Sequence, residues 1–244
     1  MDLQQILSTR KIKFDRCVFE PSVLAYIMPE HLLAIDDVKE DFMDILKWAI
    51  EFKRMWKSGD EIAINFHPLA DLTVGSIYEK PSTRTRVSFE VGISRLGGYP
   101  LTLLKNDIQL GKSETVADTA NVLSRFLGCI TYRCFAHSDV AELAANSSVT
   151  VINALSDKHH PCQAAADLMT IIEEFPDNKS LKVAWVGDGN NVLHDLMLAC
   201  AMLGIDIHYA CPEGYEPADD VVSRAEEYAS ENNSKVISTT DPID

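Results

Sequence analysis

Short apolar runs typical of buried strands alternate with segments of helical periodicity along this chain, and this alternation constrains its fold more than any other feature. The strand-like runs lie at residues 72–78, 100–104, 129–132, 149–155, 181–186, 205–210 and 236–238. Helical patterns separate them, and a further helix is expected before the first strand, from Asp36 or Asp37 to Gly59. Strands that alternate with helices form parallel sheets covered on both faces. We therefore expect an α/β fold with two doubly wound parallel-sheet domains.

A polar segment at 177–180 separates two groups of strands and predicts a domain boundary there, or inside the helix before it. We expect a first domain over 29–176 and a second over 177–244. The second domain is expected to be incomplete, because a helix-start signature at 240–242 is followed at once by the last residues. Residues 1–28 are expected to form an N-terminal arm rather than a transit peptide, because acidic residues interrupt the basic ones.

The charge of the chain limits its partners. Acidic residues outnumber basic ones 37 to 22, which gives a net charge of −15 at pH 7 and argues against nucleic acid or an anionic membrane as a partner. No apolar run approaches the ~20 residues that a membrane span needs. Six cysteines without a C-x-x-C pair favour reduced thiols in an intracellular protein. We expect a cytoplasmic location, with a mitochondrial one as the alternative, and no cofactor.

The segment from Glu79 to Glu90 combines a strand end, a tight loop and the first turn of a helix. The unpaired N–H groups of such a turn and the positive end of its dipole favour a bound anion. Three hydroxyls and two arginines between Ser82 and Arg86, with Lys80 nearby, add donors suited to phosphate oxygens. The alternative is a simple N-cap at Ser82 with solvated arginines. The density of donors favours a phosphate-like ligand.

Three further polar clusters follow predicted strands, namely Arg133, the segment His160–Gln163 and the segment Gly187–Asn191. Ligands of open parallel sheets bind beyond the carboxyl ends of the strands, so we expect these clusters to meet the first one. Taken singly, each has a structural alternative, such as an ion pair for Arg133 or a helix start at His160. A metal site at His159, His160 and Cys162 is disfavoured for lack of further ligands at zinc spacing. A dinucleotide site is disfavoured because a third glycine is missing.

The sequences Ser-Thr-Arg-Thr-Arg at 82–86, His-Pro-Cys-Gln at 160–163 and Gly-Asp-Gly-Asn-Asn at 187–191 closely resemble, in order and separation, the carbamoyltransferases. The two asparagines of the third motif make the ornithine branch of that family the nearest match. The resemblance extends from about residue 29 to the end of the chain. It implies carbamoyl phosphate and ornithine as substrates, and transfer of the carbamoyl group to the side-chain amine to give citrulline and phosphate.

The resemblance also implies roles for individual residues. The phosphate of carbamoyl phosphate would be held by Ser82, Thr83, Arg84 and Thr85. The catalytic residues at its carbamoyl end would be Arg133, His160 and Gln163. Asn191 would bind the backbone of ornithine, and Gln109 would reach the site of a neighbouring subunit, which implies a homotrimer.

Two motifs of the family do not occur in these 244 residues, an Asp-x-x-x-Ser-Met-Gly loop for the amino acid and a His-Cys-Leu-Pro segment. Binding of carbamoyl phosphate can therefore be carried over residue by residue, whereas complete catalysis cannot. Two alternatives stay open. One is a non-catalytic, C-terminally truncated member that binds carbamoyl phosphate or sister subunits, and the other is a sibling transferase for aspartate or putrescine.

Overall fold

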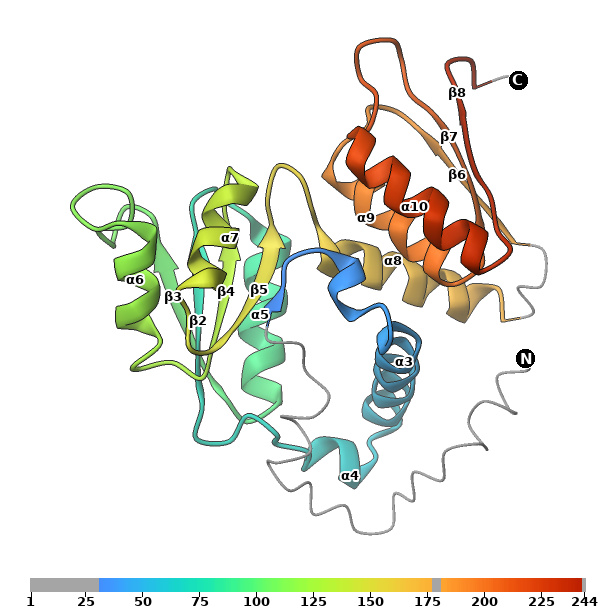
Figure 1. Ribbon diagram of the computed structural model, residues 1–244. Helices are drawn as coiled ribbons and strands as arrows, with labels where there is room; N and C mark the ends of the chain where they lie inside the picture. The colour runs from blue at the N-terminus through green and yellow to red at the C-terminus, as the bar shows by residue number, and fades with distance from the viewer. Residues whose placement is uncertain (1–30, 177–180, 243–244) are drawn as a thin grey trace.

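The computed structural model describes residues 31–176 and 181–242, which form two parallel β-sheets flanked by helices (Figure 1). The predicted N-terminal arm, 1–28, and the polar segment at 177–180 lie outside the described residues. The α/β class with two parallel sheets is confirmed. Among the described residues, no helix combines the length and the apolar character that crossing a bilayer would need.

The first sheet has five parallel strands in the order β1-β5-β4-β2-β3. Their bounds are β1 His31–Leu32, β2 Thr73–Tyr78, β3 Tyr99–Leu104, β4 Cys129–Arg133 and β5 Thr150–Leu155. Helix α5 (Thr83–Arg95) covers one face, and α6 (Val116–Leu123) and α7 (His137–Ala145) cover the other (Figure 1). The pattern of apolar runs predicted four of these strands. It missed β1, because two residues are too short for a period-2 pattern.

The second sheet has three parallel strands in the order β6-β7-β8. Their bounds are β6 Lys182–Val186, β7 Asp206–Ala210 and β8 Val236–Thr239. Helices α9 (Asn191–Met202) and α10 (Asp219–Glu231) pack side by side against it (Figure 1). Each of these five elements matches a predicted one to within one or two residues, because strand and helix patterns alternate cleanly in this part of the sequence.

The single helix expected from Asp36 or Asp37 to Gly59 is wrong. The structure has a 3-10 turn, η1 (Ile35–Val38), followed by helix α3 (Phe42–Ser58), and Gly59 ends α3 with φ at 73°. The carboxylate of Asp37 accepts the N–H groups of Leu33 and Ala34 instead of capping α3. A short helix, α4 (Glu61–Ile64), follows Gly59.

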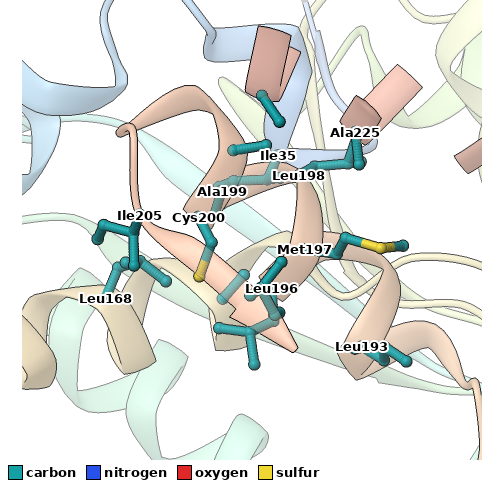
Figure 2. Close-up of a cluster of buried hydrophobic side chains, with 14 of the residues drawn as sticks. Ile35, Leu168, Leu193, Leu196, Met197, Leu198, Ala199, Cys200, Ile205 and Ala225 are labelled. Atoms are coloured by element: carbon teal, nitrogen blue, oxygen red, sulfur yellow. The ribbon is translucent and has the colours of Figure 1, made fainter. Parts of the chain in front are cut away.

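Helix α8 (Pro161–Glu174) follows β5 but contributes to the same core as the second sheet. Its residues Ala164, Leu168 and Ile172 share a buried cluster with α9, α10, η1 and α3. Figure 2 shows Leu198 of α9 beside Ala225 of α10, and Cys200 on the side of Leu168 and Ile205. A separate cluster fills the first sheet. The predicted boundary at 176–177 stays a prediction.

Helix α9 is enclosed by other elements on all sides. Every residue from Leu193 to Ala201 is buried, including His194 and Asp195. Buried polar groups require hydrogen-bond partners, and both residues find partners in the loop between β5 and α8. Ile35 also donates to Asp195, and Ala218 donates to His194. The most buried helix of the second sheet is therefore bonded directly to the edge of the first sheet.

Replacing Leu143 of α7 by alanine is expected to lower the free energy of unfolding by about 2–5 kcal/mol, because its side chain is fully buried and the change leaves a cavity. Urea unfolding followed by circular dichroism measures the change. Val122→Ala on α6 is the matched control, since Val122 is 52% exposed and its truncation should cost less than about 0.5 kcal/mol. Equal losses for the two variants would contradict this packing.

Candidate functional site

The loops that follow β2 and β4 leave the first sheet in opposite directions. These strands are neighbours, but β2 leads to α5 on one face and β4 leads to α7 on the other. The strand order thus reverses between β2 and β4, and such a switch point opens a crevice at the carboxyl edge where ligands bind in parallel sheets. Three of the four predicted clusters follow β2, β4 and β5 at this edge.

The first turn of α5 is capped by Ser82, whose side-chain oxygen accepts the backbone N–H of Thr85 at 3.3 Å. Thr83 and Arg84 are exposed at this turn. Arg86 is instead paired with Glu90 at 2.9 Å on the surface of the helix. For Arg86, the structure is closer to the alternative of a surface arginine than to that of a phosphate ligand. The spacing of four residues between Arg86 and Glu90 is the sequence signal that distinguishes Arg86 from Arg84. The turn therefore presents Arg84, hydroxyls and backbone N–H groups together.

Arg133 joins the two sides of the switch point. It ends β4, and its Nη1 donates to Oγ1 of Thr85 at 3.3 Å. Its Nε is buried and has no hydrogen-bond partner among the described residues. Burial lowers the pKa of Arg133 from its ordinary value, and the positive charge of Arg84 lowers it further. A guanidinium with unused donors beside a second cation is an arrangement that an anion would stabilise.

Lys80 adds a third positive charge to this crevice. Its Nζ lies 5.0 Å from the ring centroid of Phe135. Burial lowers the pKa of Lys80, and repulsion by Arg133 lowers it further. In a chain with a net charge of −15, Lys80, Arg84 and Arg133 form a local basic cluster. The sequence predicted such a cluster from Lys80, Arg84 and Arg86, but Arg86 is paired with Glu90.

His160 lies between this basic cluster and the second sheet. It is the residue before α8, and its backbone N–H donates to the carboxylate of Asp195 on α9. Its Nδ1 is buried without a partner among the described residues. Burial lowers the pKa of His160 to about 4, and repulsion by Arg133 contributes. The imidazole is therefore neutral at pH 7 and offers one donor and one acceptor.

Gln163 lies on the first turn of α8, with an exposed side chain that donates from Nε2 to Asp167 at 2.8 Å. Its backbone N–H bonds to the carbonyl oxygen of His160. The structure therefore ties Gln163 to His160 through one helical turn, while its side chain points along α8.

The segment Gly187–Asn191 links β6 to α9. Asn190 caps α9 by accepting the N–H of Val192 at 2.9 Å, and Asn191 donates from Nδ2 to the carbonyl oxygen of Ser156 at 2.5 Å. A Cβ atom on Gly189 would meet the backbone of Pro217 at 2.1 Å, so this glycine allows two loops to pack closely.

Gln109 makes no side-chain hydrogen bond to these residues in the part of the chain that the structure describes. It lies in the loop between β3 and α6, is exposed, and accepts the hydroxyl of Ser113 at 3.2 Å. Arg133 bonds to Thr85, and its charge acts on the pKa of His160. Ser82–Arg84 lie on the turn that contains Thr85, Gln163 lies on the turn that follows His160, and Asn191 bonds to the loop before His160. Among the described residues, no side-chain hydrogen bond links Gln109 to any of them. Asp195 was missed by the sequence analysis. Its signal was a His-Asp pair inside an otherwise apolar helical run.

Within residues 31–176 and 181–242, no three histidine, cysteine, aspartate or glutamate side chains are placed to hold a metal ion together. His159 is bonded to Asp195 instead. The thiol of Cys162 has its pKa raised to about 12 by burial, which disfavours the thiolate that binds metals.

Two family models match the chain. The carbamoyl phosphate-binding domain of aspartate/ornithine carbamoyltransferases matches residues 30–173, and the aspartate/ornithine-binding domain of the same family matches residues 179–244. The ornithine carbamoyltransferase of Bacillus subtilis is 48% identical over 214 residues, which are 87% of this chain and 65% of that protein. A catabolic ornithine carbamoyltransferase of Thermoplasma volcanium is 45% identical over 87% of this chain and 68% of its own length.

A solved structure agrees with these matches. The ornithine carbamoyltransferase of Pyrococcus furiosus superposes with a TM-score of 0.84 at 46% identity, over 89% of this chain and 68% of that one. The present chain thus spans about two thirds of the length of the relatives that it matches.

The ring of His160 is expected to titrate near pH 4 in the folded chain, and near the ordinary value of about 6.5 when the chain is unfolded in urea. Its neutral, buried form therefore contributes stability that is complete above about pH 6.5 and is lost as the pH falls toward 4. NMR titration of the ring protons measures both midpoints. A folded-state midpoint at or above the unfolded one would contradict the burial of the His160 ring.

Proposed function

The chain belongs to the aspartate/ornithine carbamoyltransferase family, and we propose that its site binds carbamoyl phosphate and transfers the carbamoyl group to the side-chain amine of ornithine. The products are citrulline and phosphate. The observation that carries this proposal is the bond of Arg133 to Thr85 at the switch point of the first sheet, with the charge of Arg133 reaching His160.

The basic cluster supports the phosphate half of the proposal. Ser82, Thr83, Arg84 and Thr85 surround the N-terminus of α5, where N–H groups and the helix dipole favour a dianion. A phosphate there would lie near Lys80 and Arg84. Its negative charge would offset the repulsion between these two side chains and Arg133. The arginine forks suit its tetrahedral oxygens.

The carbamoyl half would lie between Arg133 and His160. In the reaction, the free amine of ornithine forms a bond to the carbonyl carbon, and charge develops on the carbonyl oxygen. Donors from Arg133, Thr85 and neutral His160 would stabilise that oxygen, an effect commonly worth ~3–4 kcal/mol for a well-placed donor. The carbon–oxygen bond to phosphate then breaks, phosphate leaves with the electron pair, and the amine proton passes to phosphate or solvent.

On the acceptor side, Asn191 is the proposed contact for the amino-acid backbone. One of its amide N–H groups is used by Ser156, and no described residue donates to its carbonyl oxygen. That oxygen would accept from the α-ammonium group of ornithine. Ornithine, aspartate and putrescine are the candidate acceptors, and the aspartate/ornithine-binding model that matches residues 179–244 covers the two amino acids among them. The relatives named ornithine carbamoyltransferase favour ornithine.

We propose a homotrimer in which Gln109 completes the site of a neighbouring subunit. The side chain of Gln109 is exposed, and among the described residues it has no hydrogen bond to Thr85, Arg133 or His160. Both features favour a role outside the site of its own chain. A cytoplasmic location stays a prediction.

Arg84→Ala is expected to weaken binding of carbamoyl phosphate about ten- to hundredfold, because it removes charge-assisted hydrogen bonds to phosphate. Calorimetric titration of this chain measures the affinity. Arg95→Ala is the matched control, because Arg95 lies at the other end of the same helix, with its guanidinium over the ring of Trp56 at 5.0 Å. Equal losses for both variants would indicate a general charge effect and contradict the site.

Turnover is measured in the same preparation by citrulline formation, with ornithine, putrescine and aspartate offered in competition. Citrulline from ornithine supports the proposal. Tight binding of carbamoyl phosphate without any carbamoylated product would support the non-catalytic alternative instead, and carbamoylation of another amine would support the sibling transferase.

The shared site predicts complementation between two inactive variants. Chains with Arg84→Ala and chains with Gln109→Ala, when co-expressed, would form mixed trimers in which some sites have both native residues. Carbamoyl phosphate binding should then exceed that of either variant alone. Co-expressed chains that bind no better than the separate variants would contradict the contribution of Gln109 to a neighbour.

A further inference from the structure

Asp195 is a completely buried carboxylate on α9 that accepts three N–H groups. Its Oδ1 accepts the backbone N–H of Ile35 at 2.8 Å and is 3.2 Å from Nδ1 of His159. Its Oδ2 accepts the backbone N–H of His160. A buried charge is costly unless it is fully hydrogen-bonded, so this arrangement holds η1, the β5–α8 loop and α9 in one geometry.

The N-terminal part of α9 binds the β5–α8 loop at three successive points. Asn191 donates to the carbonyl oxygen of Ser156, Nδ1 of His194 bonds to that of Lys158 at 2.7 Å, and Asp195 accepts from His160. Residues spaced by three and four lie on one face of a helix. One face of α9 therefore fixes the loop at alternate residues up to His160.

His159 is oriented from both sides of its ring. The guanidinium of Arg224 lies 3.5 Å from Nε2 and donates to it, so Nδ1 has the proton and donates to Asp195. Arg224 is itself paired with Asp36 at 2.6 Å. The carboxylate of Asp195 thus accepts from donors only, and one of them, His159, is held by Arg224 as well.

The side chain of His160 has no such support. Its Nδ1 is buried without a partner among the described residues, so the ring takes its position from the backbone of the loop. The bond from the His160 N–H to Asp195 fixes the backbone of the same residue.

We propose that Asp195 is a positioning residue for His160, which it holds at the carboxyl edge of the first sheet for the carbamoyl end of the donor substrate. This inference rests on the proposed function. Asp195 lies on α9, and the first residue of α9, Asn191, is the proposed contact of the acceptor substrate. The same helix would therefore position residues for both substrates.

The test compares two probes. Phosphonoacetamide is a stable analogue with a phosphonate and an amide, and inorganic phosphate has only the first part. In Asp195→Asn, the amide has one acceptor oxygen for three N–H groups, so at least one donor loses its partner. Affinity for phosphonoacetamide should fall about tenfold or more, whereas affinity for inorganic phosphate, which depends on α5, should change less than about twofold.

Asp220→Asn is the matched control. Asp220 pairs with Lys158 of the same loop at 2.6 Å, but it is exposed and does not touch His160. This variant should bind both probes as the unmodified chain does. A parallel loss of both probes in Asp195→Asn, no loss at all, or an equal loss in Asp220→Asn would overturn the inference.

A second measurement needs no variant, should Asp195→Asn fail to fold. Hydrogen exchange at the His160 amide of the unmodified chain should be slow, and it should be slower with phosphonoacetamide bound than with phosphate bound. Fast exchange with either probe would overturn the inference.

The failure of the proposed function gives a different result. If the unmodified chain binds phosphonoacetamide no more tightly than phosphate, the proposed function itself is wrong. Preference in the unmodified chain that persists in Asp195→Asn rejects only the positioning role.

Discussion

The hydrogen bond from Arg133 to Thr85 is the contact on which the site depends, because it joins the two loops that diverge from β2 and β4. Parallel pairing aligns the ends of the strands, and the reversal of strand order leaves a crevice between these loops. Arg133 spans that crevice, and Lys80 and Arg84 concentrate positive charge beside it. The geometry of the sheet thus creates an anion site in a strongly acidic chain.

The second constraint is the burial of α9. A helix enclosed on all sides satisfies its polar residues only through neighbouring elements, and His194 and Asp195 bond to the β5–α8 loop. The same burial that stabilises the core of the second sheet therefore also fixes His160 at the edge of the first sheet. Stability and the donor site share these contacts, so changes in α9 should affect both.

Much of this arrangement follows from local sequence. Every strand except the two-residue β1 lies in a short, mainly apolar run, and parallel pairing alone predicts that Arg133 and His160 lie at the same edge as Ser82. What local patterns could not show depends on distant partners. The start of α3 was misplaced because Asp36 pairs with Arg224 and Asp37 with nearby backbone. Asp195 was missed because Ile35 lies 160 residues away.

The most direct test of the central claim is an experimental structure of the chain with bound phosphonoacetamide. The account predicts the phosphonate at the N-terminus of α5, within hydrogen-bond distance of Ser82 and Arg84, and the amide between Arg133 and His160. A phosphonate bound elsewhere, or an amide directed away from Arg133 and His160, would contradict it.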